Sequence, residues 1–320
     1  MHLKSLLWTG GKLLVTGAVV AGIAFGVGVL EPNLAVQESD ADIVSFGRKE
    51  VTPTEKFVAS MEDLGHSKPQ AFNLNGNVVY FATRLHDQSP EVVREEYMQK
   101  FREKGLAPNA SKYEDEDQSI MTAWNGGVIT FHESEDRIFM GGMLPVKQVS
   151  SPDELEALAE TYDGQPWELY KGFHNVELLR SGDGTIATSS WSDANFDYEK
   201  MLPGNDKLDQ NVDLEVPSCP GCERVSAFED LDPQRVFRSN VYQGSSSPQH
   251  LMRFYDQALT QRGWRPTETT HVMERIYQNV EFEGKEALKR QYEKDGEVIT
   301  ILSHPSEDGT GATAHTVVSN

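Results

Sequence analysis

The pattern of hydrophobic and polar positions begins with a long apolar stretch near the N-terminus. Residues 13–30 read LLVTGAVVAGIAFGVGVL, which is 18 residues without a charge. A helix of ~20 such residues crosses the ~30 Å hydrocarbon layer of a membrane. We therefore expect residues 1–11 to be a cytoplasmic N-terminus, residues 12–30 to form a transmembrane anchor, and residues 31–53 to be a linker.

The charges on either side of this stretch predict its orientation. Lys4 and Lys12 precede it, whereas Glu31 and Glu38 follow it before any basic residue appears. Basic residues favour the cytoplasmic side of a membrane. We expect a single-pass protein of a bacterial inner membrane whose C-terminal domain is extracytoplasmic (periplasmic). The alternative is a cleaved signal peptide and a secreted protein.

Small residues recur at every fourth position of the predicted anchor. Ala18, Gly22 and Gly26 share one face of a helix, where they would let a second helix approach closely. The spacing allows a homodimer through the anchor. Gly and Ala are also common in membrane spans that do not pair, so this second interpretation stays open.

An internal repeat organises the rest of the chain. Residues 89–108 (SPEVVREEYMQKFREKGLAP) align without a gap on residues 247–266 (SPQHLMRFYDQALTQRGWRP). In each copy Ser and Pro predict the start of a helix, and Gly predicts a left-handed turn at its end. Apolar residues recur every four positions in both copies: Val93, Tyr97, Phe101, Leu251, Tyr255 and Leu259. Each helix therefore has an apolar stripe that requires a sheet or a second helix.

Runs of β-branched and aromatic residues predict strands on both sides of each repeated helix. The first half has such runs at residues 78–85 and 127–131, and the second half has them at residues 235–242 and 297–301. The turn dipeptides Asn125-Gly126 and Asp295-Gly296 precede the later strand of each half. Between the halves, a helix opens at Ser151 and two strands flank Asp183-Gly184.

These elements predict an α+β fold, in which an N-terminal transmembrane helix is followed by a duplicated strand-helix-strand-strand domain with mainly antiparallel sheets. We expect a first α+β repeat at residues 54–150, a middle helix-hairpin segment at residues 151–217, and a second α+β repeat at residues 218–320.

The net charge excludes one class of partner. The 320 residues include 29 Lys and Arg against 50 Asp and Glu, which gives a formal charge of −21. Such a balance repels phosphate backbones, so nucleic acid is not an expected partner. The membrane is expected as a partner through residues 12–30. Whether the exported domain binds a protein or a small molecule stays open.

Only two cysteines occur, Cys219 and Cys222, in the order C-P-G-C. A C-x-x-C pair either closes a small structural disulfide or serves as a redox-active dithiol. The thioredoxin-like order is C-G-P-C, and the residues after Cys222 do not have the pattern of a long helix. A structural disulfide is the favoured interpretation, with redox catalysis and shared metal binding as alternatives.

Local motifs for catalysis are absent from the sequence. The nine histidines show no H-x-H or H-E-x-x-H spacing, and no G-x-S-x-G or phosphate-binding loop occurs. No catalytic residue, cofactor or metal site is therefore predicted. We expect a membrane-anchored binding or assembly module of the bacterial envelope without catalytic activity. The alternatives are an exported thiol-disulfide oxidoreductase using Cys219 and Cys222, and a hydrolase with a cleft between the repeats.

Overall fold

The computed structural model describes residues 51–108, 116–161, 166–201, 216–267, 287–306 and 309–319. These residues form two compact units. Among them, the first unit comprises residues 51–69 and 80–196, and the second comprises residues 70–79 and 197–319. The strand β2 (Asn77–His86) runs from the second unit into the first.

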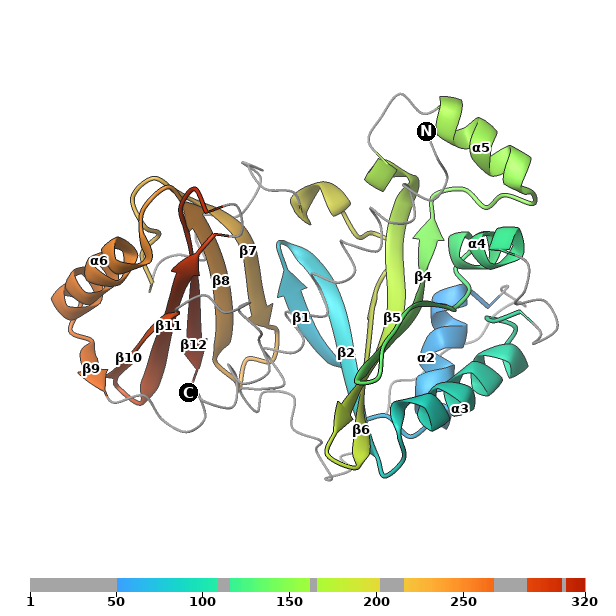
Figure 1. Cartoon of the computed structure of the whole chain (residues 1–320), viewed down its shortest axis with the longest axis horizontal. Coiled ribbons are helices and arrows are strands. Elements are labelled where there is room, and N and C mark those ends of the chain that lie inside the picture. The colour runs from blue at the N-terminus through green and yellow to red at the C-terminus, as the bar shows by residue number, and fades with distance from the viewer. Residues whose placement is uncertain are drawn as a thin grey trace. The chain divides into compact units, whose positions relative to one another are not determined.

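The first unit contains helices, a 3-10 helix and strands in addition to most of β2. Its helices are α2 (Pro53–Asp63), α3 (Pro90–Glu103), α4 (Glu116–Trp124) and α5 (Pro152–Thr161), and its 3-10 helix is η2 (Pro166–Leu169). Its strands are β3 (Ile129–Glu133), β4 (Arg137–Pro145), β5 (Tyr170–Ser181) and β6 (Gly184–Ser192). Figure 1 shows α2 and α3 side by side.

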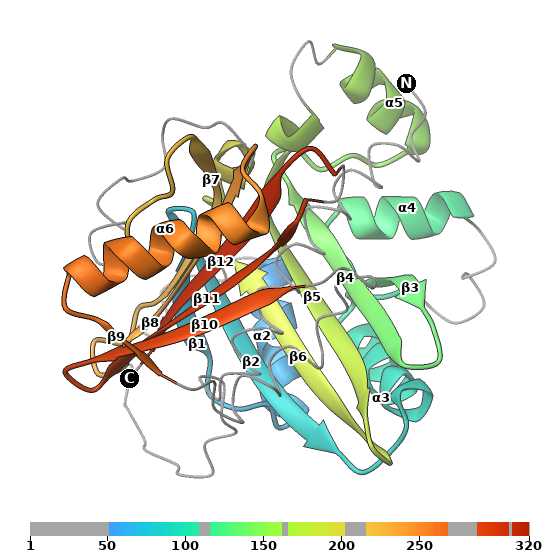
Figure 2. The same cartoon turned by 60° about the vertical axis from the view of Figure 1, so that its left-hand side comes forward.

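The second unit is built of strands with one α-helix, α6 (Pro248–Gln261), and the 3-10 helix η3 (Tyr198–Met201) among its described residues. Its strands are β1 (Gln70–Leu74), β7 (Cys222–Asp230), β8 (Phe237–Gly244), β9 (Arg265–Thr267), β10 (Leu288–Lys294), β11 (Glu297–Pro305) and β12 (Ala312–Ser319). Figure 2 shows α6 lying across strands of this unit, and it packs against β9, β10, β11 and β12.

The described strands are hydrogen-bonded in the order β3-β4-β5-β6-β2-β1-β7-β8-β12-β11-β10-β9. When α4, α5 and η2 are left aside, the first half has the chain order β1-β2-α3-β3-β4-β5-β6. This order recurs in the second half as β7-β8-α6-β9-β10-β11-β12, and the strands take equivalent places in the sheet. By this topology β11 corresponds to β5. The sequence pattern pairs the run at residues 127–131 of the first half with the run at residues 297–301 of the second half. This prediction is wrong, because the first run falls in β3, the third strand of its half, and the second run falls in β11, the fifth strand of its half.

The two repeated helices have the ends that their sequences predict. Ser89 and Ser247 are the N-caps, each with extended backbone angles and followed by proline. After each helix, a glycine with positive φ, +69° at Gly105 and +87° at Gly263, reverses the chain. The next residue then donates its N–H to a carbonyl five residues earlier, as in Leu106 to Phe101. Both α3 and α6 are 14 residues long as a result.

The apolar stripes of the two helices form separate cores. In the first unit Val93, Tyr97 and Phe101 of α3 are all 0% exposed and pack in one cluster with residues of α2 and β4–β6. In the second unit Tyr255 and Leu259 of α6 are equally buried, in a cluster with residues of β8, β10, β11 and β12. Full burial of one such side chain contributes about 1.5–3 kcal/mol. Each helix is therefore held by its sheet.

The predicted α+β class is wrong, because the described chain is mainly an antiparallel sheet of twelve strands with few helices. The predicted strand-helix-strand-strand unit has three strands, whereas each half of the described chain has six, β1–β6 and β7–β12. β10 shows why: its sequence LKRQYEK has little apolar alternation, and it is a strand because residues 288–294 pair along their whole length with β11. Such pairing between segments is not visible in a local pattern.

The predicted transmembrane helix also fails to appear. None of the helices in the part of the chain that the structure describes combines the length and hydrophobicity of a membrane span. The expected anchor at residues 12–30, with Ala18, Gly22 and Gly26, lies outside the described residues. The predicted single-pass inner-membrane localisation, with a periplasmic C-terminal domain, is therefore contradicted.

Candidate functional site

The two cysteines singled out in the sequence form a disulfide. Cys219 is 2% exposed and belongs to the core beneath α6, whereas Cys222 is the first residue of β7. Gly221 between them has a φ of +69°, and the Cys222 N–H donates to the Cys219 carbonyl over 3.0 Å. Reactive thiols are exposed and lie in an electropositive environment such as a helix N-terminus. Here the pair joins a turn to a strand, as a structural crosslink does.

A group of polar side chains that the sequence analysis did not select meets inside the first unit. Tyr97 Oη lies 2.6 Å from His66 Nε2 and 3.1 Å from His86 Nε2. Ser189 Oγ lies 3.2 Å from the other ring nitrogen of His66, Nδ1. These residues come from α3, the loop after α2, β2 and β6. Since His66 and Ser189 are 123 residues apart, no local motif could indicate the group.

One arrangement of protons satisfies every contact in this group. Ser189 Oγ donates to the Ala82 carbonyl over 3.0 Å, so it accepts from His66 Nδ1. His66 Nε2 is then an acceptor for the Tyr97 hydroxyl, and Tyr97 Oη accepts in turn from His86 Nε2. Burial lowers the pKa of His66 to about 4, and it lowers that of His86 as well. Both imidazoles are neutral near pH 7.

This arrangement fits a structural role for the Ser189–His66 pair better than a catalytic one. Ser189 is 0% exposed, and its proton is already held by a backbone carbonyl. A general base works best with a pKa near the operating pH, which a value of about 4 for His66 does not provide. The group ties three elements of the first unit together around the hydroxyl of Tyr97.

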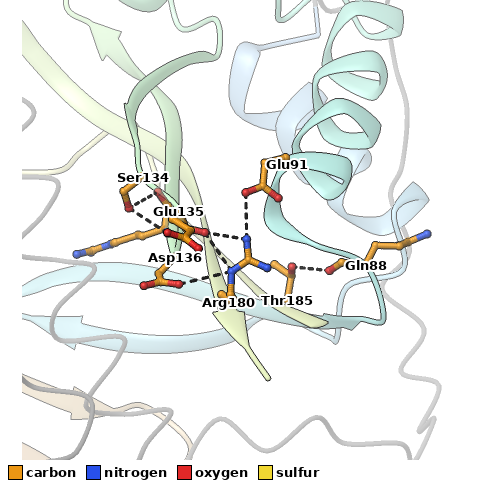
Figure 3. A network of polar contacts seen from close by, with 8 residues as sticks. Gln88, Glu91, Ser134, Glu135, Asp136, Arg180 and Thr185 are labelled. Carbon is orange, nitrogen blue, oxygen red and sulfur yellow. Dashed lines mark hydrogen bonds and ion pairs between the residues drawn. The ribbon is translucent and has the colours of Figure 1, made fainter. Parts of the chain in front are cut away.

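A second polar network centres on Arg180 of β5 (Figure 3). Its guanidinium donates to Glu91 Oε1 over 3.0 Å and to the Glu135 carbonyl over 2.8 Å, and it lies 3.5 Å from Asp136 Oδ1. Figure 3 shows these groups converging on one side chain from α3 and from the turn between β3 and β4. The network holds the turn between β3 and β4 against α3.

A cavity with a volume of about 550 Å³ lies among the described residues of the first unit. It lies where α3 and α4 end. Its lining residues are Arg102, Gly105, Leu106, Ala107, Pro108, Met121, Thr122, Asn125, Gly127, Val149 and Ser150. Ligand pockets measure ~300–1,000 Å³, so the cavity has the volume of a small-molecule site.

The lining combines one cation with both polar and apolar side chains. Asn125 is occupied by two hydrogen bonds to Val149, and the Ser150 hydroxyl donates to Glu154 Oε2 over 2.7 Å. Arg102, in contrast, has no carboxylate within ion-pair distance among the described residues. The lining itself contains no carboxylate, imidazole or thiol. The cavity can therefore hold a small ligand and pair with a negative group on it.

Known proteins add no further constraint. Neither a family model, nor a curated protein, nor a solved structure matches this chain. Function must be inferred from the chain's own geometry, and the cavity beside Arg102 is the feature with the shape of a ligand site.

Proposed function

We propose that this protein is a binding module without catalytic activity, and that the cavity at the ends of α3 and α4 takes a small ligand with an apolar body and an anionic group. The observation that supports the proposal is the pairing of Arg102 with apolar lining residues in about 550 Å³. Arg102 also lies in the last turn of α3, where it complements the helix dipole.

The ligand class follows from the chemistry of the lining. Leu106, Met121 and Val149 offer apolar surface, and a guanidinium binds a carboxylate, sulfonate or phosphate through paired N–H donors. A ligand that is wholly apolar would leave the Arg102 charge unpaired. A ligand that is wholly polar would leave the apolar lining exposed to water.

Titration with anilinonaphthalene sulfonate, a fluorescent anion with an apolar ring system, tests the proposal. We expect saturable binding with one site per chain. Arg102→Glu should weaken that binding about tenfold or more, because a hydrogen bond to a charged group contributes about 1.5–3 kcal/mol. Ala107→Phe, which fills the cavity, should abolish it.

The matched control is Arg253→Glu, which makes the same charge change on an exposed arginine of α6. Its affinity for the probe should equal that of the wild type. If Arg102→Glu and Ala107→Phe, shown to be folded by circular dichroism, bind the probe as the wild type does, the cavity is not the ligand site and the proposal fails.

A further inference from the structure

Two histidines that are scattered in the sequence face each other on neighbouring strands of the second unit. His304 of β11 and His315 of β12 approach with their Nε2 atoms 3.2 Å apart, and their ring centroids are 5.3 Å apart. The strand register pairs His304 with Thr313 and His315 with Leu302, so the two histidines are diagonal neighbours on one face of the sheet. This face is the one turned away from α6, because Ile301 of the core packs on the other face.

The ring of His304 is oriented by the backbone. Its Nδ1–H donates to the Pro305 carbonyl over 2.8 Å, which leaves the lone pair of Nε2 directed at His315. Metal-binding histidines have this same arrangement, in which one ring nitrogen donates to a carbonyl and the other binds the ion. His304 is therefore oriented as a ligand would be.

The spacing of the two nitrogens fits a shared ion. Zinc–nitrogen bonds are about 2.0–2.1 Å, so two ligands at a tetrahedral angle have their nitrogens about 3.3 Å apart. The observed 3.2 Å differs little from this value. We propose that His304 and His315 form a binding site for a divalent transition-metal ion, with both Nε2 atoms as ligands.

The rest of the coordination shell determines which ions suit the site. The described residues contain no group of three or more His, Cys, Asp or Glu side chains placed to hold a metal. Water or an added ligand would therefore complete the shell. Imidazole nitrogens suit Zn²⁺, Ni²⁺ and Cu²⁺, and affinity rises toward Cu²⁺, whereas Mg²⁺ and Ca²⁺ require oxygen ligands. With two protein ligands, we expect micromolar affinity for Zn²⁺.

The test is a calorimetric titration of the untagged full chain with Zn²⁺ alone, followed by Ni²⁺ and Mg²⁺. We expect one Zn²⁺ per chain at this site, a response to Ni²⁺ as well, and no Mg²⁺ response. His304→Ala and His315→Ala should each weaken the Zn²⁺ affinity at least about tenfold, since even loss of a group that only orients a ligand costs 10–100-fold. Zn²⁺ should also raise the melting temperature of the wild type and leave that of these variants unchanged.

The matched controls are His132→Ala and His250→Ala, which remove exposed histidines from β3 and α6. Both should bind Zn²⁺ as the wild type does. If His315→Ala does not fold, His304→Gln takes its place as the test variant. It removes one imidazole at a half-buried position, and its Zn²⁺ affinity is compared with that of the wild type. Equal Zn²⁺ affinity in the wild type and the His304 variants would mean that the pair is only an imidazole–imidazole hydrogen bond, and the proposal would be overturned.

Discussion

Tyr97 Oη lies within hydrogen-bond distance of two imidazoles at once, 2.6 Å from His66 Nε2 and 3.1 Å from His86 Nε2. The equivalent tyrosine of the second half, Tyr255, is also 0% exposed and occupies the same position in α6. The repeat therefore conserves the aromatic ring within each core. The two histidines around the Tyr97 hydroxyl, His66 and His86, belong to the first unit.

Tyr97→Phe should destabilise the protein by about 1–3 kcal/mol, because it removes the only hydroxyl between His66 and His86 and leaves their facing nitrogens without that partner. Urea denaturation followed by tryptophan fluorescence measures the change. Tyr80→Phe is the control: Tyr80 stacks on Trp191 with centroids 5.7 Å apart, and no described residue bonds its hydroxyl. Similar losses in both variants would show that the Tyr97 hydroxyl has no special role.

The free energy of unfolding should fall as the pH is lowered from 6.5 to 4. Burial lowers the pKa of His66, His174 and His315 to about 4 in the folded protein, whereas unfolded histidine has a pKa near 6.5. Between these values the unfolded chain binds more protons, so acid favours unfolding by up to about 1.4 kcal/mol per pH unit for each residue. Above pH 6.5 the effect is absent.

Denaturation curves at pH 7, 6 and 5 measure this slope. His174 is fully buried and stacks on Phe57 with ring centroids 4.6 Å apart, so His174→Phe keeps an aromatic ring in place and removes one titrating group. The variant should show a shallower dependence of stability on pH, by up to about 1.4 kcal/mol per unit. An unchanged slope would show that His174 is not held neutral.

Tyr255→Ala should cost about 3–5 kcal/mol, the usual loss for truncating a large buried aromatic side chain. Tyr255 is 0% exposed in the core of the second unit, in contact with Phe254 at a centroid distance of 5.1 Å. Gln257→Ala, on the exposed side of the same helix, should change stability by less than about 0.5 kcal/mol. Thermal denaturation compares the two. A small loss for Tyr255→Ala would contradict its place in the core.

Replacing Cys219 and Cys222 together by Ala should leave the fold intact. The disulfide closes a loop with a sequence separation of 3, so its entropic contribution is at most about 2 kcal/mol. Binding of the anionic probe should be unaffected, since neither cysteine lines the cavity. Far-ultraviolet circular dichroism and the probe titration measure the two outcomes. Loss of binding with a retained fold would revive a functional role for the thiols.

The helices of the repeat are the part of this protein that its sequence determines. Ser89 and Ser247 begin them, Gly105 and Gly263 end them, and the four-residue spacing around Tyr97 and Tyr255 selects the buried face. These are local effects: an N-cap, a positive φ and a helical period each act within a few residues. The turn at Asp295-Gly296 is equally local, because both residues have the positive φ that the dipeptide tolerates.

The tertiary structure decided what depends on distant segments. Strand β10 exists because β11 pairs with it. Residues 125–126 are expected to form a hairpin turn, but they follow the end of α4, where Gly126 has a φ of +81°. The group around Tyr97, the facing rings of His304 and His315, and the cavity beside Arg102 each combine residues from separate elements. No local pattern contains such groups, because hydrogen-bond geometry and shape arise only once the sheet has set the register of its strands.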